Sequence, residues 1–228
     1  YPVVLLNSVV SQVSFPIFSQ IQENKTSLRS FLKTGITYVT FITFPLMIGL
    51  IVVAKPLIEV VLTEKWLPSV PYLKLFCLIG AVYPIQAINL NALNALGRSD
   101  LFLKVDFINK AIIIFTIFIS YRFGIISIII GQIINSFIAF YLYSFCNGKL
   151  LNYPFLSQIK DVFPTLLISV AMGVLTFLLK FLNIENQLLL LVIQISSGVT
   201  IYILICYFTK LESFMNILNN IRRKTNYL

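Results

Sequence analysis

Apolar runs of about 20 residues follow one another along almost the whole chain, and no other sequence feature constrains the fold as strongly. A helix that crosses a bilayer needs about 20 mostly apolar residues. The 228 residues are 58% hydrophobic and 11% charged, whereas a soluble domain is about 45–50% apolar and about 25% charged. A soluble fold would leave much of this apolar surface in water, so the sequence predicts an integral membrane protein.

The runs predict helices and not membrane strands. A membrane strand needs only about 10 residues of alternating polarity, but these runs are about twice as long and do not alternate. The predicted fold class is therefore all-α, a polytopic transmembrane bundle of about seven helices. The predicted spans are residues 3–21, 35–54 with an extension to 61, 72–96, 101–121, 124–145, 163–182 and 188–208.

Loops rich in Lys and Arg alternate with loops that are poor in them. The first loop holds Lys25, Arg29 and Lys33, and the second holds Lys65 beside Glu64. Because cytoplasmic loops carry the excess of basic residues, the first loop and the basic C-terminal tail are predicted to be cytoplasmic. The net charge of +9 is then a topology signal. A nucleic-acid-binding protein is disfavoured, because no base-stacking motif accompanies the charge.

A polar stretch at residues 147–154 is the clearest internal break. It predicts a five-helix part at residues 1–147 and a terminal transmembrane hairpin with a cytoplasmic tail at residues 148–228. The chain opens at Tyr1 inside an apolar run, without the charged start of a signal peptide. We therefore expect a larger protein whose N-terminal part precedes this chain.

The residues needed for common catalytic and metal chemistry are missing from the sequence. The chain has no histidine, and its three cysteines show no CxxC spacing. These features disfavour a zinc site and a disulfide framework and exclude histidine as a general base. We predict no catalytic residue, no metal and no cofactor. A membrane-embedded glycosyl- or acyltransferase, which would need a catalytic His or Asp at a membrane face, is disfavoured.

Uncharged polar residues recur at helical spacing within three of the predicted spans. Buried amides in membrane proteins usually hydrogen-bond across helices as packing contacts. The alternative is that these residues line a water-filled cavity whose amide-rich walls suit a polyol such as a sugar. The candidate cavity residues are Asn7, Ser11, Gln86, Asn89, Asn91, Asn94, Gln132 and Asn135.

Two pairs of ionisable residues lie four positions apart in or beside predicted spans, Lys55 with Glu59 and Asp106 with Lys110. This spacing puts each pair on one helix face, so each can neutralise itself near an interface while the lysine snorkels. Ionisable groups within a bilayer are costly and often functional. The second interpretation is that a carboxylate binds a coupling ion or that a lysine contacts an anionic substrate.

Three segments resemble polysaccharide-export flippases. They read NSVVSQVSFP at residues 7–16, TEKWLPSVPYL at 63–73 and NLNALNALGRSD at 89–100. Together they are similar to the lipopolysaccharide biosynthesis (Wzx-type) branch of the multidrug/oligosaccharidyl-lipid/polysaccharide exporter superfamily. The resemblance covers most of the first 150 residues, and the last hairpin is similar only in being apolar.

The resemblance implies a transporter of two six-helix lobes related by pseudo-twofold symmetry, often with an extra terminal helix pair. This chain would supply most of the C-terminal lobe and that pair. Such proteins flip undecaprenyl-diphosphate-linked oligosaccharides across the membrane by alternating access, for lipopolysaccharide, O-antigen or exopolysaccharide biosynthesis. The family's cationic cavity residues lie largely in the N-terminal lobe, so no diphosphate-binding residue is transferred to this chain.

The implied partners are the lipid-linked oligosaccharide, membrane lipid, the N-terminal lobe of the same protein, and polysaccharide polymerases and glycosyltransferases. The implied location is the bacterial cytoplasmic (inner) membrane. The alternative function is a cation-coupled multidrug or small-molecule exporter of the same superfamily, which a deeply buried, essential carboxylate would favour. The sequence does not specify the sugar, the coupling ion, the direction of transport or the oligomeric state.

Overall fold

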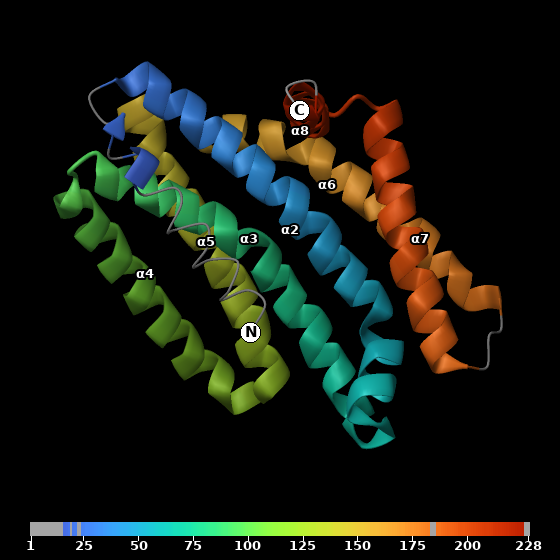
Figure 1. The fold of residues 1–228 in the computed structure, drawn as a ribbon. Helices are drawn as coiled ribbons and strands as arrows, with labels where there is room; N and C mark the ends of the chain where they lie inside the picture. Colours follow the sequence, from blue (N-terminus) through green and yellow to red (C-terminus); the bar gives the residue numbers. More distant parts are fainter. Residues whose placement is uncertain (1–15, 19, 22–23, 183–185, 226–228) are drawn as a thin grey trace. The chain divides into compact units, whose positions relative to one another are not determined.

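In the computed structural model of the chain, the described residues are 16–18, 20–21, 24–182 and 186–225. Every element within this part is a helix, which confirms the predicted all-α class (Figure 1). The elements are α2 (Lys25–Leu62), η1 (Glu64–Ser69), α3 (Val70–Ala95), α4 (Ser99–Ser120), η2 (Tyr121–Phe123), α5 (Ile125–Leu151), α6 (Phe155–Leu178), η3 (Leu179–Leu182), α7 (Gln187–Phe208) and α8 (Glu212–Thr225).

Five helical segments in the described part are long and apolar enough to cross a membrane: Lys25–Leu62, Glu64–Ala95, Ile125–Leu151, Phe155–Phe181 and Gln187–Phe208. Helix α4 has 22 residues, but Lys104, Asp106 and Lys110 lower its apolar character. The span predicted at residues 3–21 lies almost entirely outside the described residues. The chain is thus a multi-pass membrane protein.

Several helices extend past the predicted spans into segments that were expected to be loops. Helix α2 has 38 residues and is about 57 Å long, whereas the hydrocarbon core is about 30 Å thick. Its first turns carry Lys25, Arg29 and Lys33, all exposed, so the predicted basic loop is helical. Charged side chains on a helix can extend beyond the hydrocarbon, and the charge pattern therefore did not mark the helix ends.

The polar stretch at residues 147–154 also differs from its prediction as a break. Helix α5 continues through Asn147 to Leu151. The helix ends only at Asn152, which adopts a left-handed conformation with φ of 53°, as Asn tolerates at helix C-termini. Helix α6 begins at Phe155, eight residues before the predicted span, so the connection is a short turn.

The chain divides into two compact units that are interleaved along the sequence. Unit 1 consists of Tyr1–Thr40 and Leu75–Val162, and unit 2 consists of Phe41–Lys74 and Phe163–Leu228. Helices α2 and α6 each contribute to both units. The sequential division at residue 147 stays a prediction about the parts of a larger transporter.

Unit 1 contains the α4–α5 hairpin, which η2 closes, and the greater part of α3 (Figure 1). Gly124 has a φ of 90°, a conformation that costs glycine little, and it separates η2 from α5. The core of the unit is a cluster of Leu93, Val105, Ala139 and Tyr143 from these three helices.

Unit 2 contains the second part of α2, most of α6, and helices α7 and α8. Its core is a cluster of Ile168, Met172, Tyr202 and Cys206. The Tyr202 hydroxyl donates a hydrogen bond of 2.8 Å to the carbonyl of Phe41. This bond joins α7 to α2 with a polar contact inside an otherwise apolar core.

The tight packing of the α5–α6 turn leaves no room for a methyl group at Gly148, so we expect an alanine there to destabilise the protein. A Cβ atom at this position would lie 2.9 Å from the Cα atom of Pro154, a backbone atom that moves only if the turn moves. We expect Gly148→Ala to lower the free energy of unfolding by about 1–3 kcal/mol, measured by denaturant titration in detergent micelles.

Gly49→Ala is the matched control, because the nearest atom to its added Cβ would be the Met172 Cε atom at an ordinary 3.9 Å. Alanine favours a helix over glycine by about 1 kcal/mol, so this variant should keep or gain stability. Equal stability of the two variants would contradict the proposed close approach at Gly148.

Candidate functional site

A cluster of buried polar side chains joins α3, α5 and α6 within unit 1. Asn89, Ser144, Asn147 and Gln158 each have an exposed fraction of 0%. Asn89 Nδ2 donates to Gln158 Oε1 at 2.9 Å, and Gln158 Nε2 donates to Asn89 Oδ1 at 3.0 Å. This reciprocal amide pair holds the beginning of α6 against the middle of α3.

Helix α5 joins the same cluster through two residues. Asn147 Nδ2 donates to Asn89 Oδ1 at 2.8 Å and to the Asn89 carbonyl at 2.9 Å. The Ser144 hydroxyl donates to Gln158 Oε1 at 2.9 Å. Because unpartnered amides are costly in an apolar interior, these bonds favour one register of the three helices. We call these four residues the amide cluster.

Other predicted cavity residues in the described part also lie in helix contacts. Gln86 Nε2 donates to Ser136 Oγ at 2.8 Å, joining α3 to α5. Asn135 Oδ1 accepts a hydrogen bond of 3.1 Å from Thr116 Oγ1, joining α5 to α4. Asn91 is buried, while Asn94 and Gln132 are partly buried. Asn7 and Ser11 lie outside the described residues.

The structure therefore does not gather the predicted polar residues into one open site. Asn89 belongs to the amide cluster, whereas Gln86 and Asn135 form separate contacts. Sequence reasoning missed Ser144, Asn147 and Gln158, because they fall near predicted helix ends where polar residues are ordinary. A role for the predicted residues in a substrate cavity stays a prediction.

The two predicted ionisable pairs differ in their contacts. Lys110 and Asp106 form an ion pair on α4 with a distance of 2.8 Å. Lys55 and Glu59 form no ion pair with any described residue. Lys55 is exposed and Glu59 is partly buried. Of the two predicted pairs, Asp106 and Lys110 therefore neutralise each other, as their helical spacing allows. Ion coupling by either pair stays a prediction.

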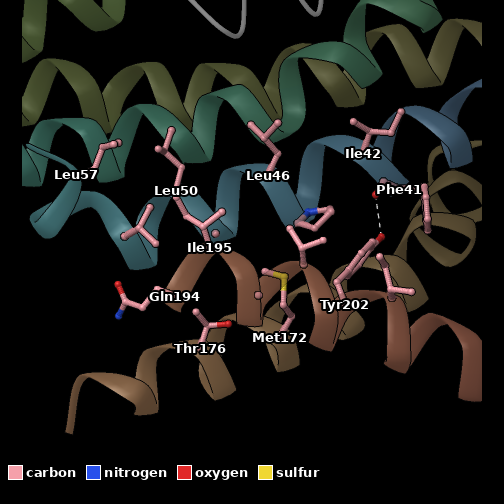
Figure 2. Close-up of a pocket in the computed structure, with 16 residues that line it drawn as sticks. Phe41, Ile42, Leu46, Leu50, Leu57, Met172, Thr176, Gln194, Ile195 and Tyr202 are labelled. Atoms are coloured by element: carbon pink, nitrogen blue, oxygen red, sulfur yellow. Dashed lines mark hydrogen bonds between the residues drawn. The ribbon is translucent and has the colours of Figure 1, made fainter. Parts of the chain in front are cut away.

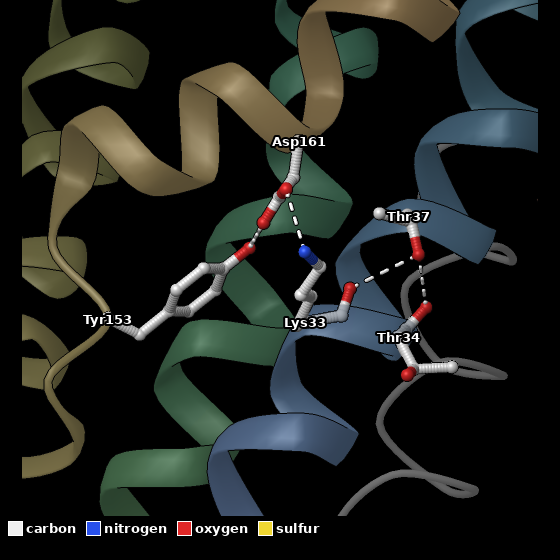
Figure 3. Close-up of polar contacts among 5 residues, drawn as sticks. All are labelled: Lys33, Thr34, Thr37, Tyr153 and Asp161. Atoms are coloured by element: carbon white, nitrogen blue, oxygen red, sulfur yellow. Dashed lines mark hydrogen bonds and ion pairs between the residues drawn. The ribbon is translucent and has the colours of Figure 1, made fainter. Parts of the chain in front are cut away.

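A third charged contact was not predicted. Lys33 Nζ on α2 lies 3.0 Å from Asp161 Oδ1 on α6, and the Tyr153 hydroxyl donates to Asp161 Oδ2 at 2.7 Å. Figure 3 shows the carboxylate between the ammonium group and the phenol. Burial, together with the hydrogen bond to Asp161, raises the pKa of Tyr153 well above its ordinary value.

An apolar groove lies within unit 2, along α2, α6 and α7 (Figure 2). Its volume is about 550 Å³, which is within the usual range of ligand sites. Met172 and Tyr202 lie at its buried side, with exposed fractions of 3% and 8%, whereas Ile195 and Val199 at its edge are 50% and 56% exposed. The groove is therefore open along one side.

Besides Tyr202, whose hydroxyl is bonded to the Phe41 carbonyl, two polar side chains interrupt the apolar lining. Thr176 and Gln194 are buried, and neither Thr176 Oγ1 nor Gln194 Oε1 has a hydrogen-bond partner among the described residues. In Figure 2, Gln194 lies toward the end of the groove away from Phe41 and Tyr202. A ligand in this groove would be mainly hydrocarbon, with room for one polar contact near Gln194.

Comparison with known proteins supports a common origin with polysaccharide biosynthesis proteins. Residues 1–71 match a family described as "Polysaccharide biosynthesis protein". The chain is 30% identical over 146 residues to "Lipopolysaccharide biosynthesis protein WzxC" of Escherichia coli, which covers 62% of this chain and 30% of that protein. The resemblance to Wzx-type flippases is confirmed.

A second relative of this chain is "Teichuronic acid biosynthesis protein TuaB" of Bacillus subtilis. The two are 34% identical over 100 residues, which is 44% of this chain and 21% of that protein. The chain thus spans less than a third of the length of either relative. That the chain is not an enzyme stays a prediction.

The fold of this chain matches a solved structure, "Lipid II flippase MurJ, inward closed conformation". The TM-score is 0.72 at 19% identity, and the match covers 91% of this chain and 45% of that one. At this identity the match concerns the fold. It shows that the helices are arranged as in part of that structure.

The amide cluster predicts a loss of stability when Gln158 is replaced by Leu, which has a similar size. Ser144 would lose its hydrogen bond to Gln158, and Asn89 would keep only its bonds to Asn147 and to the Ile85 carbonyl. A buried polar group left unpaired costs about 1–3 kcal/mol. We expect a destabilisation of this order in detergent micelles. Gln132→Leu, at a partly buried position on α5, should change stability much less, and equal losses would argue against the cluster.

The buried phenol of Tyr153 should make the stability of the folded protein decrease at alkaline pH. The pKa of this phenol is raised in the folded state above its unfolded value of about 10. Its contribution is therefore complete below about pH 10 and is lost as the pH rises toward the folded pKa. Stability of the wild type should fall more steeply above pH 10 than that of Tyr153→Phe.

The measurement is thermal unfolding in detergent over a pH series that extends to alkaline values. Tyr121→Phe, at an exposed tyrosine, is the control and should keep the wild-type slope. Parallel curves for Tyr153→Phe and the wild type would rule out the proposed contribution of the buried phenol.

Proposed function

We propose that the protein moves lipid-linked oligosaccharides across the bacterial cytoplasmic membrane by alternating access. The observation that carries this proposal is the apolar groove of unit 2, in a chain similar to polysaccharide biosynthesis proteins. A lipid-linked sugar has a hydrophilic head that cannot cross hydrocarbon unaided and a long apolar tail that can remain in it. A carrier must therefore offer different surfaces to the two parts.

The groove offers the apolar surface that the tail of a lipid-linked sugar requires. Its walls come from α2, α6 and α7 and are almost entirely hydrocarbon, apart from Thr176, Gln194 and the Tyr202 hydroxyl. Its open side, edged by Ile195 and Val199, would let a chain of hydrocarbon enter sideways without passing a polar barrier. We assign this groove to the isoprenoid tail of the substrate.

The sugar head would be held elsewhere in the complete transporter. Within the described part of the chain, Asn94 and Gln132 are the predicted polar residues that are only partly buried. The diphosphate would be bound by cations of the N-terminal lobe. The proposed topology places the basic first turns of α2 and the C-terminus in the cytoplasm. The polymerase and glycosyltransferases of the polysaccharide pathway remain proposed partners.

The alternative of a cation-coupled exporter gains no specific support. The carboxylate of Asp106 is paired with Lys110, and Glu59 is only partly buried. Neither has the deeply buried, unpaired setting that would favour ion coupling. We therefore propose one function.

The test is complementation of a bacterium that lacks its own polysaccharide flippase by the full-length gene. We expect surface polysaccharide to reappear and the cytoplasmic-leaflet pool of lipid-linked sugar to fall. Val199→Trp should fill the edge of the groove and lower the recovery severalfold, because the tail would lose its site.

Val192→Trp is the matched control, since Val192 lies on the same helix and is 55% exposed but does not line the groove. It should complement like the wild type at equal protein level. Should no polymer appear with several donor sugar clusters while drug or cation efflux changes, the exporter alternative replaces the proposal. Equal recovery of surface polysaccharide by the two Trp variants would contradict the proposal that the groove holds the isoprenoid tail.

A further inference from the structure

Helix α8 begins directly after the last membrane span. Helix α7 has 22 residues, so it is about 33 Å long and matches the thickness of the hydrocarbon core. It ends at Phe208, and α8 starts at Glu212. Four residue steps reach about 14 Å at most, so α8 must start in or beside the headgroup layer.

The turn between the two helices redirects the chain. Lys210 adopts a φ of 51°, and the backbone N–H of Leu211 donates to the Cys206 carbonyl at 3.2 Å. In Figure 1, α7 runs across the view while α8 is seen nearly along its axis, so the two helices are far from parallel. A helix turned in this way lies along a membrane surface, because α7 itself crosses the membrane.

Helix α8 has two chemically different sides. Phe214, Met215, Ile217 and Leu218 are partly buried, whereas Glu212, Asn216 and Asn219 are exposed. Ser213 is a polar residue on the buried side. Phe214 also packs against the core of unit 2, where its ring centroid lies 6.3 Å from that of Phe41. This two-sided pattern is typical of helices that lie in the membrane interface, and the Phe214 contact holds the start of the helix in place.

The charge of the segment is strongly one-sided. The last turn of α8 contains Arg222, Arg223 and Lys224 in succession, and Lys210 precedes the helix. Glu212 is the one acidic residue between positions 210 and 225, which leaves a formal charge of +3. Clusters of basic residues at the end of a membrane span attract anionic lipid headgroups by about 1 kcal/mol per residue.

We propose that α8 is an interfacial helix that binds anionic phospholipid headgroups through its basic end, with its apolar side inserted below them. The short connection to α7 holds α8 at the lipid surface. The positive charge of α8 then favours anionic over zwitterionic lipid. This role is independent of the transported substrate. A soluble acidic protein would also complement the charge, but it would not match the apolar side or the position at the end of a span.

The test uses the full chain in lipid nanodiscs with an environment-sensitive fluorophore at Asn219→Cys. Cys77 and Cys206 are buried, so replacing the partly buried Cys146 by Ala leaves one readily labelled thiol. The nanodiscs contain phosphatidylcholine alone or mixed with phosphatidylglycerol. Lipids that carry a quencher on the acyl chain report how deeply the label is inserted.

We expect the anionic lipid to shift the label to an apolar environment and to increase its quenching, and added salt to reverse both changes. Replacing Arg222, Arg223 and Lys224 together by Gln should lower the docking equilibrium constant on the order of 100-fold, or about fivefold per cation. The control replaces three exposed cations elsewhere, Lys25, Lys65 and Lys104, by Gln.

The control variant should dock like the wild type, and both variants should keep the elution profile of the folded chain. Equal fluorescence and quenching in the two lipid mixtures would overturn the proposal. It would also be overturned if both triple variants lost docking equally, because net charge rather than α8 would then be responsible. Docking only after addition of a soluble acidic protein would point to that partner in place of lipid.

Discussion

Hydrocarbon offers no hydrogen bonds, and the architecture of this chain depends on that constraint. Every backbone N–H and C=O within the membrane must be satisfied inside its own segment, so each crossing is a helix. The same rule applies to side chains. The amides of Asn89, Asn147 and Gln158, each with an exposed fraction of 0%, hydrogen-bond to one another, although Asn147 Oδ1 has no partner among the described residues. Apolar contacts alone would let α3, α5 and α6 slide, whereas these directional bonds fix their register.

The fold was predictable from the sequence because the apolar runs directly reflect this constraint. Their order was predictable, but several of their ends were not. Helix α2 begins 10 residues before the predicted start at residue 35. The basic residues did not reveal this, because lysine and arginine are as compatible with a helix in the headgroup layer as with a loop. Asn147 was interpreted as part of a break, and it lies instead inside α5. Polarity indicates a need for partners and does not by itself indicate a loop.

The candidate sites were less predictable, for a related reason. Helical spacing identified Gln86, Asn89 and Asn135 as residues with inward-facing positions, and all three are buried. It could not distinguish a cavity wall from a contact between helices, because the partner is on another helix. The groove of unit 2 had no sequence signal at all. Its lining is as apolar as a surface that faces lipid, and only the packing of α6 and α7 against α2 gives it a shape.

Helix α4 has a consequence for how the protein is made. Its ion pair of 2.8 Å between Asp106 and Lys110 lowers the cost of placing two charges near hydrocarbon, yet ionisable residues at a helix centre still oppose insertion by about 2.5–3.5 kcal/mol each. Helix α5 carries no charge until Lys149 and is joined to α4 only by η2 and Gly124. During synthesis, α4 should therefore wait at the translocon until α5 emerges, and the two should enter the bilayer together as a hairpin.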